Sequence, residues 1–189
     1  HFLKCGVKTK KQGGEDLKEE LEFMAERISD IFKGDKEIIT FYSIKDGVGK
    51  SSIIYEWGKI LSGKGKNVAI LDLDRQYSYM RFLQKEKGEL EELDTSKTGL
   101  GFNVYRHTET NLHVIDLNLN IDSDLSGVYI TNILYKIRNH FDIILVDTDS
   151  FYGEGKEQLF KISNRLQIVV DDREDILLGT VDFIEKHLD

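Results

Sequence analysis

A glycine-containing loop carries the residues of this chain that are best suited to chemistry. It consists of Lys45-Asp46-Gly47-Val48-Gly49-Lys50-Ser51-Ser52 and lies between an apolar run and a helical pattern. Glycines leave backbone N–H groups open to an anion, and the start of the following helix attracts negative charge. Lys50 would reach the β- and γ-phosphates of a nucleotide, and the Ser51 hydroxyl would be a Mg²⁺ ligand. The loop therefore predicts binding of a polyphosphate, most simply Mg-ATP.

The loop departs from the usual phosphate-binding pattern at one position. The GxxxxGK(S/T) pattern has glycine where this chain has Ile44. A fragment as short as GVGKS also occurs in proteins that bind no nucleotide. Further residues are therefore needed to identify the site.

Acidic residues supply this second indication. Asp72 and Asp74 stand at the end of one predicted strand, and Asp147 ends another. Ligands bind outside the carboxyl ends of strands in an open parallel sheet, so we expect these carboxylates to converge near the phosphates. Asp147 suits the Walker B role in the Mg²⁺ shell, and an aspartate pair could orient an attacking water. Any one of them could be a turn or cap residue, but together with the loop they indicate a nucleotide site.

Short apolar runs alternate with helical patterns from residue 37 onward. The pattern predicts strands over 38–43, 67–73, 112–116, 141–147 and 166–170, and helices over 51–62, 77–86, 128–139 and 173–188. Residues 87–103 are polar and predict a loop. Continuous apolar strands between helices are typical of an α/β fold with a mostly parallel sheet flanked by helices on both faces. We expect residues 37–189 to form this domain, incomplete at its C-terminus because a strand normally follows such a last helix.

Residues 1–36 differ in composition and predict a polar tail followed by an amphipathic linker helix over 15–33. One apolar stripe of this helix contains Leu17, Leu21, Met24, Ile28 and Ile31. We expect the helix to pack on the domain. The alternative is a link to another domain or subunit.

The composition of the chain limits the kinds of partner and the compartment that we expect for it. The net charge of −8 opposes non-specific binding to nucleic acid, which requires lysine and arginine to displace counterions. Cys5 is the only cysteine, which indicates a reducing compartment and a cytoplasmic protein. No apolar run approaches the roughly 18 residues of a membrane span, so we expect membrane attachment only through a partner.

The loop Lys45-x-Gly47-x-Gly49-Lys50-Ser51, followed by Asp72, Asp74 and Asp147-Thr148, resembles the deviant Walker A ATPases of the ParA/MinD type. The loop of that family reads KGGxGK(S/T), and its signature lysine stands where Lys45 does. The resemblance implies an ATP-dependent homodimer in which Lys45 acts across the interface and Lys50 holds the phosphates. It also implies that Asp74 positions the hydrolytic water and that Asp72 and Asp147 serve the Mg²⁺ shell.

Two departures from this family affect the expected activity. Asp46 replaces a glycine, and Asp149-Ser150 replaces two prolines. Like charges about 4 Å apart repel by roughly 1 kcal/mol in water and by several times more where water is excluded. We therefore expect nucleotide binding with slow turnover, and Asp46 opposes ordinary dimerisation.

Within that family the chain looks most like the TadZ/CpaE group, which implies ATP-dependent localisation of a pilus secretion apparatus together with protein partners. One alternative is a catalytically degenerate nucleotide-binding scaffold. Another is a DNA-partitioning ATPase, which the acidic balance opposes. A tyrosine autokinase of capsule synthesis uses a related loop but is expected to have a tyrosine-rich tail.

Overall fold

The described part of the protein forms a seven-stranded mixed sheet in a computed structural model, which describes residues 36–74, 88–94, 102–117 and 126–188. The strands are β1 Glu37–Tyr42, β2 Val68–Leu73, β3 Leu90–Leu93, β4 Asn103–His107, β5 Leu112–Asp116, β6 Ile143–Thr148 and β7 Arg165–Ile168. Their order is β3-β4-β5-β2-β6-β1-β7. From β5 to β7 all neighbours are parallel, whereas β4 is antiparallel to β3 and β5.

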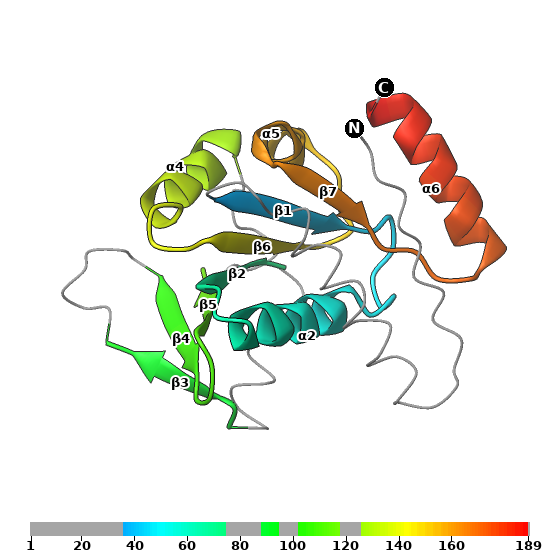
Figure 1. The fold of residues 1–189 in the computed structure, drawn as a ribbon. Helices are drawn as coiled ribbons and strands as arrows, with labels where there is room; N and C mark the ends of the chain where they lie inside the picture. The colour runs from blue at the N-terminus through cyan, green and yellow to red at the C-terminus, as the bar shows by residue number, and fades with distance from the viewer. Residues whose placement is uncertain (1–35, 75–87, 95–101, 118–125, 189) are drawn as a thin grey trace.

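Helices cover both faces of this sheet (Figure 1). They are α2 Lys50–Gly63, α4 Gly127–Ile137, α5 Glu154–Ile162 and α6 Glu174–His187. Figure 1 shows α2 on one face and α4 with α5 on the other. The alternation of β2 explains this arrangement, because Val68 and Ile70 join the cluster beneath α2 while Ala69 and Leu71 join the cluster beneath α4. The predicted α/β fold with a mostly parallel sheet is confirmed.

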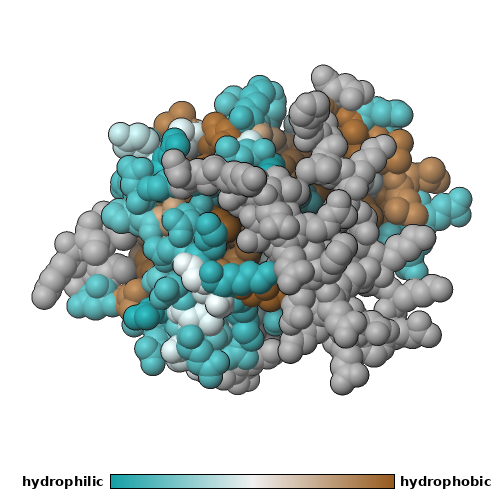
Figure 2. Space-filling view, viewed as in Figure 1, coloured by the Kyte–Doolittle hydropathy of each residue, from teal (hydrophilic) through white to brown (hydrophobic). Residues whose placement is uncertain are grey.

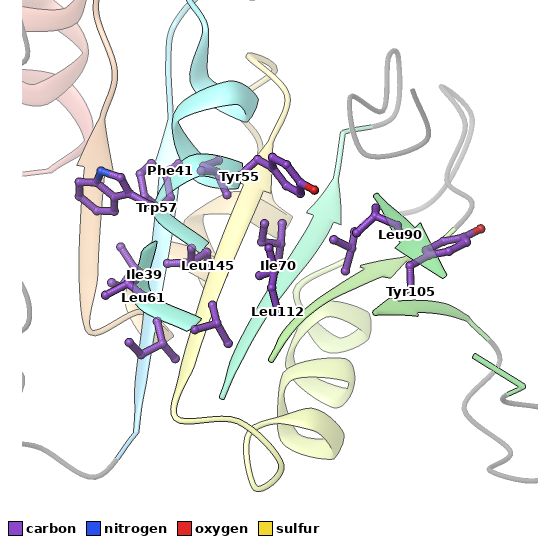
Figure 3. Packing of buried hydrophobic residues seen from close by; sticks show 14 residues of the cluster. Ile39, Phe41, Tyr55, Trp57, Leu61, Ile70, Leu90, Tyr105, Leu112 and Leu145 are labelled. Carbon is purple, nitrogen blue, oxygen red and sulfur yellow. The ribbon is translucent and has the colours of Figure 1, made fainter. Parts of the chain in front are cut away.

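The core beneath α2 brings the helix close to the sheet (Figure 3). The rings of Trp57 and Phe41 meet edge to face with centroids 5.4 Å apart. At Gly58 a methyl group would lie only 2.8 Å from Cδ1 of Leu112. This close packing fixes the second half of α2 against the sheet.

Helix α6 lies beside α5, near the carboxyl end of β1 (Figure 1). Its inward side buries Ile176, Thr180 and Phe183. The ring of Phe183 packs on that of Tyr42, the last residue of β1, with centroids 4.8 Å apart. The opposite side of α6 is apolar and exposed at Leu177, Leu178, Val181 and Ile184. This face is part of the brown surface over α6 in Figure 2.

The structure corrects the sequence-based prediction at three places. Strand β4, Asn103–His107, was not predicted. Part of the predicted loop over 87–103 is strand β3, which only Leu90 anchors in the core because its other three residues are exposed. Helix α5 was not predicted, since Lys156 and Leu159 are its only buried residues and give no apolar periodicity. The helices predicted over 15–33 and 77–86 lie outside the described residues.

None of the described helices has the length and apolar character needed to cross a membrane.

Candidate functional site

The loop between β1 and α2 presents open backbone to a ligand. Gly47 and Gly49 have φ of 80° and 87°, a left-handed conformation that favours glycine. Gly49 occupies the N-cap position of α2, where its lack of a side chain leaves no side-chain hydrogen bond to the first turn. That turn carries no acidic residue, so its partial positive charge is not neutralised locally. The loop therefore has the features that a phosphate group requires.

Lys50, the first residue of α2, is held by a carboxylate in this structure. Its ammonium donates to Oδ1 of Asp147 over 2.6 Å, and the two side chains are 6% and 1% exposed. Burial makes this charge-assisted bond strong and makes loss of either partner unfavourable. The ion pair joins the phosphate loop to the carboxyl end of β6.

Three aspartates stand in one row across neighbouring strands. Asp72 of β2 is in register with Asp147 of β6 on one side and with Asp116 of β5 on the other. Strand alternation places all three on the α2 side of the sheet, and all three are buried. Sequence reasoning did not select Asp116, although it ends a predicted strand and the same strand-end rule would have found it. Among the described residues, no group of three or more His, Cys, Asp or Glu side chains is placed to hold a metal ion.

The remaining predicted residues differ in exposure. Asp74 is half-buried just after β2, and its backbone N–H donates to Oδ1 of Asp72 over 3.0 Å. Ser51 is half-buried in the first turn of α2, and Ser52 is exposed. The structure therefore brings Asp72 and Asp74 together in one turn beside Asp147.

Lys45 is exposed on the β7 side of the loop. Its backbone N–H donates to the Ser43 hydroxyl over 3.3 Å. The pKa of Asp171, which follows β7, is lowered mainly by a hydrogen bond from Arg173 and to a smaller extent by the charge of Lys45. The Lys45 ammonium thus lies near enough to Asp171 to lower the pKa of that carboxyl.

Asp46 points toward the chain that follows β6. Its Oδ1 accepts from the Ser150 backbone N–H over 3.1 Å, and its Oδ2 accepts from the Ser150 hydroxyl over 2.8 Å. Both carboxylate oxygens are therefore bonded to Ser150. From the sequence we expected Asp46 to bring negative charge toward the phosphates and to oppose dimerisation, and its bonds to Ser150 were not predicted.

The segment after β6, residues 149–153, is fixed by further contacts and is called the β6–α5 segment below. The Lys156 ammonium of α5 donates to the Asp149 carboxylate and to the backbone oxygens of Asp149 and Phe151. Asp149 and Lys156 are both buried. The charge at Asp149 is thus compensated inside the protein.

Tyr42 connects this segment to the core. Its hydroxyl donates to the Ser150 backbone oxygen over 3.2 Å. Burial, followed by the charges of Asp149, Tyr152 and Asp46, raises the pKa of Tyr42 to about 12. The phenol therefore stays protonated and remains a hydrogen-bond donor at neutral pH.

Ile44 occupies the position where the common motif has glycine. A methyl group built on Gly179 of α6 would lie 2.7 Å from Cδ1 of Ile44. The isoleucine thus packs against the closest part of α6 and anchors the start of the loop. This contact gives a structural reason for the departure from the motif.

An open cavity of about 550 Å³ lies between α5 and the end of α6. Its lining includes Tyr152, Phe160 and His187, and none of the predicted site residues. The cavity is therefore separate from the phosphate loop.

A family model described as an AAA domain matches residues 36–187. The match covers every described strand and helix, together with the loop and the row of aspartates. Among curated proteins, none matches this chain in sequence.

Several solved structures share the fold. The kinase domain of the Escherichia coli tyrosine kinase ETK is 12% identical, with a TM-score of 0.65 over 87% of this chain and 68% of its own. MinD from Pyrococcus horikoshii, solved with Mg-ADP, is 15% identical, with a TM-score of 0.60 over 80% of this chain and 65% of its own. A plasmid partition protein from Borrelia burgdorferi is 22% identical, with a TM-score of 0.56 over 80% of this chain and 74% of its own. At these identities the similarity establishes the ParA/MinD-like P-loop fold alone.

Proposed function

This chain belongs to the AAA_31 family of AAA domains, and we propose that it binds Mg-ATP on the loop 45–52 and uses the nucleotide to position or assemble a larger apparatus. The observation that carries this proposal is the buried ion pair between Lys50 and Asp147, at the point where an open glycine loop meets the carboxyl ends of the strands. The MinD structure with a similar fold holds Mg-ADP, which supports the choice of ligand.

The residues of the loop are placed where they could bind the phosphates of a nucleotide. The amides around Gly47 and Gly49 would bind phosphate oxygens, assisted by the start of α2. Lys50 would leave Asp147 and bind the β- and γ-phosphates.

The donors near this loop also fit a magnesium ion. The Ser51 hydroxyl would be a direct ligand, and Asp147 and Asp72, adjacent in register, would bind its water shell. When bound, the ion would neutralise charge on the phosphate oxygens.

Hydrolysis, where it occurs, would be slow. Asp74 lies in the turn after β2, where it would orient a water molecule. By resemblance to ParA/MinD proteins, Lys45 would act on the nucleotide of a second subunit, and its exposure leaves it accessible for this role. We propose a nucleotide-dependent homodimer in the cytoplasm with protein partners of the TadZ/CpaE pilus-localisation kind.

Calorimetric titration with Mg-ATP tests nucleotide binding directly. We expect Lys50→Ala to abolish measurable heat, because the phosphates lose their buried cation. Lys64→Ala, which changes an exposed lysine at the far end of α2, is the matched control and should bind like the unchanged protein. Absence of heat with the unchanged protein would reject the proposal.

A second candidate is a nucleotide-holding scaffold without turnover. The hydrogen bonds of Asp46 to Ser150 favour it, because they fix a part of the site that would otherwise respond to the nucleotide. Measuring the rate of phosphate release from ATP distinguishes the ATPase from the scaffold. Release above that of Lys50→Ala supports the ATPase, and equal release from both proteins supports the scaffold.

A further inference from the structure

The β6–α5 segment is bonded to three other parts of the protein. Asp46 of the loop accepts from both the N–H and the hydroxyl of Ser150. Tyr42 of β1 donates to the Ser150 oxygen, and Lys156 of α5 donates to the oxygens of Asp149 and Phe151. All of these contacts join one protein group to another.

In many nucleotide-binding proteins, a segment beside the phosphates detects whether the γ-phosphate is present. Contacts with the γ-phosphate and its magnesium ion order the sensing segment, and hydrolysis releases it. That mechanism requires a segment that lacks stable partners until the triphosphate arrives. Here protein groups already hold Ser150, so a triphosphate has less ordering left to bring about.

We propose that Asp46 is a positioning residue that ties the β6–α5 segment to the phosphate loop, so that the segment has the same conformation without nucleotide, with Mg-ADP and with Mg-ATP. For its ligands the inference rests on the proposed function. It makes the site a holder of nucleotide that does not report the γ-phosphate through this segment.

The charges around Asp46 agree with this role. A free carboxylate at this position would repel the phosphates, whereas a carboxylate bonded through both oxygens to Ser150 is directed toward the β6–α5 segment. The neighbouring Asp149 differs, because the ammonium of Lys156 compensates its charge. Both acidic residues that depart from the ParA/MinD pattern thus have partners in or beside one segment.

Hydrogen exchange of the backbone amides of residues 149–152 tests whether the bonds between Asp46 and Ser150 hold the segment in place. The full chain is measured without ligand, with Mg-ADP and with Mg-ATP. For the unchanged protein we expect exchange rates within about threefold of one another in all three states. In Asp46→Gly we expect exchange without ligand to be about tenfold faster or more, since both acceptors of Ser150 are lost.

Three further variants distinguish the effect of the hydrogen bonds between Asp46 and Ser150 from the effects of charge and of misfolding. Asp46→Asn removes the charge but keeps an acceptor for the Ser150 N–H, so its exchange should stay within about threefold of the unchanged protein. Ser150→Ala removes one of the two bonds and should give an intermediate rate. Asp172→Gly, the same change at an exposed aspartate, is the control and should leave these amides unaffected. Thermal unfolding establishes that each variant is folded, and Ser150→Ala carries the test if Asp46→Gly is not.

Slow exchange of these amides only in the presence of Mg-ATP would overturn the inference. The same would follow if Asp46→Gly and Ser150→Ala exchanged like the unchanged protein. Failure of the proposed function gives a different result, because calorimetry then shows no nucleotide binding. The exchange rates measured without ligand still test whether Asp46 holds Ser150.

Discussion

Lys50 and Asp147 form a buried ion pair that links the start of α2 to the end of β6. Each charge depends on the other, because a lone buried carboxylate or ammonium is strongly unfavourable. If the chain binds nucleotide as proposed, the partners would be exchanged, with Lys50 moving to the phosphates and Asp147 requiring a new cation. This exchange determines how the site should respond to metal and to substitution.

Removal of magnesium should weaken ATP binding by about 100-fold or more in the unchanged protein. Without the metal, the move of Lys50 to the phosphates leaves Asp147 buried and unpaired. In Asp147→Asn no such charge is left, so the ratio of affinities with and without magnesium should fall to about tenfold or less. Calorimetry with magnesium and with a chelator measures both ratios, and equal ratios would contradict the exchange.

Lys50→Met should lower the free energy of unfolding of the nucleotide-free protein by about 3–5 kcal/mol, because it leaves Asp147 without its cation. The double variant Lys50→Met, Asp147→Asn should recover most of this loss, since the buried charge is then absent. Urea unfolding measures both. If the double variant were as unstable as the single one, the loss would come from packing and not from charge.

Tyr42 should give the protein a dependence on alkaline pH. Its folded pKa is about 12, against 10.0 for the free side chain. Between these values the unfolded chain loses the phenol proton while the folded protein keeps it, so stability falls as pH rises through this window. Tyr42→Phe should flatten the fall in the free energy of unfolding between pH 10 and pH 12. An unchanged slope in this variant would assign the dependence to other groups.

Gly179→Ala should push Ile44 away from α6, because the added methyl group would lie 2.7 Å from its Cδ1. Because Cδ1 is the end of a side chain that can move, and alanine favours a helix by up to about 1 kcal/mol, we expect the free energy of unfolding to change by less than about 1 kcal/mol while nucleotide binding weakens. Gly63→Ala is the matched control in a helix, since a methyl group there meets no atom within 4 Å. That change should be neutral or stabilising by up to about 1 kcal/mol. Ile44→Val removes the clashing atom and should restore the Gly179→Ala protein.

Much of the site could be predicted from local sequence. The loop is recognised by glycines next to Lys50, and the pairing of Asp72 with Asp147 follows from the general rule for strand ends. The partner of Asp46 could not be predicted, because Ser150 lies 104 residues away and no local pattern joins them.

In the fold, too, elements with a clear local pattern were predicted and elements that depend on distant contacts were not. The strand over 112–116 was predicted with its observed bounds because Leu112, Val114 and Ile115 give it an apolar, largely β-branched pattern. Strand β3 was missed because it carries two glutamates and buries one leucine. Its pairing with β4 comes from tertiary contacts and not from its own composition.

Tyr42 belongs at once to the hydrophobic interior and to the site. Its ring contacts those of Phe160 and Phe183 from two different helices, while its hydroxyl holds Ser150. Tyr42 is therefore one of the side chains through which any loosening of α5 or α6 would reach the proposed nucleotide site, beside Lys156 of α5 and Ile44 next to α6. On heating, such a domain should lose its ligand and its tertiary packing in one event, with no inactive yet folded stage between them.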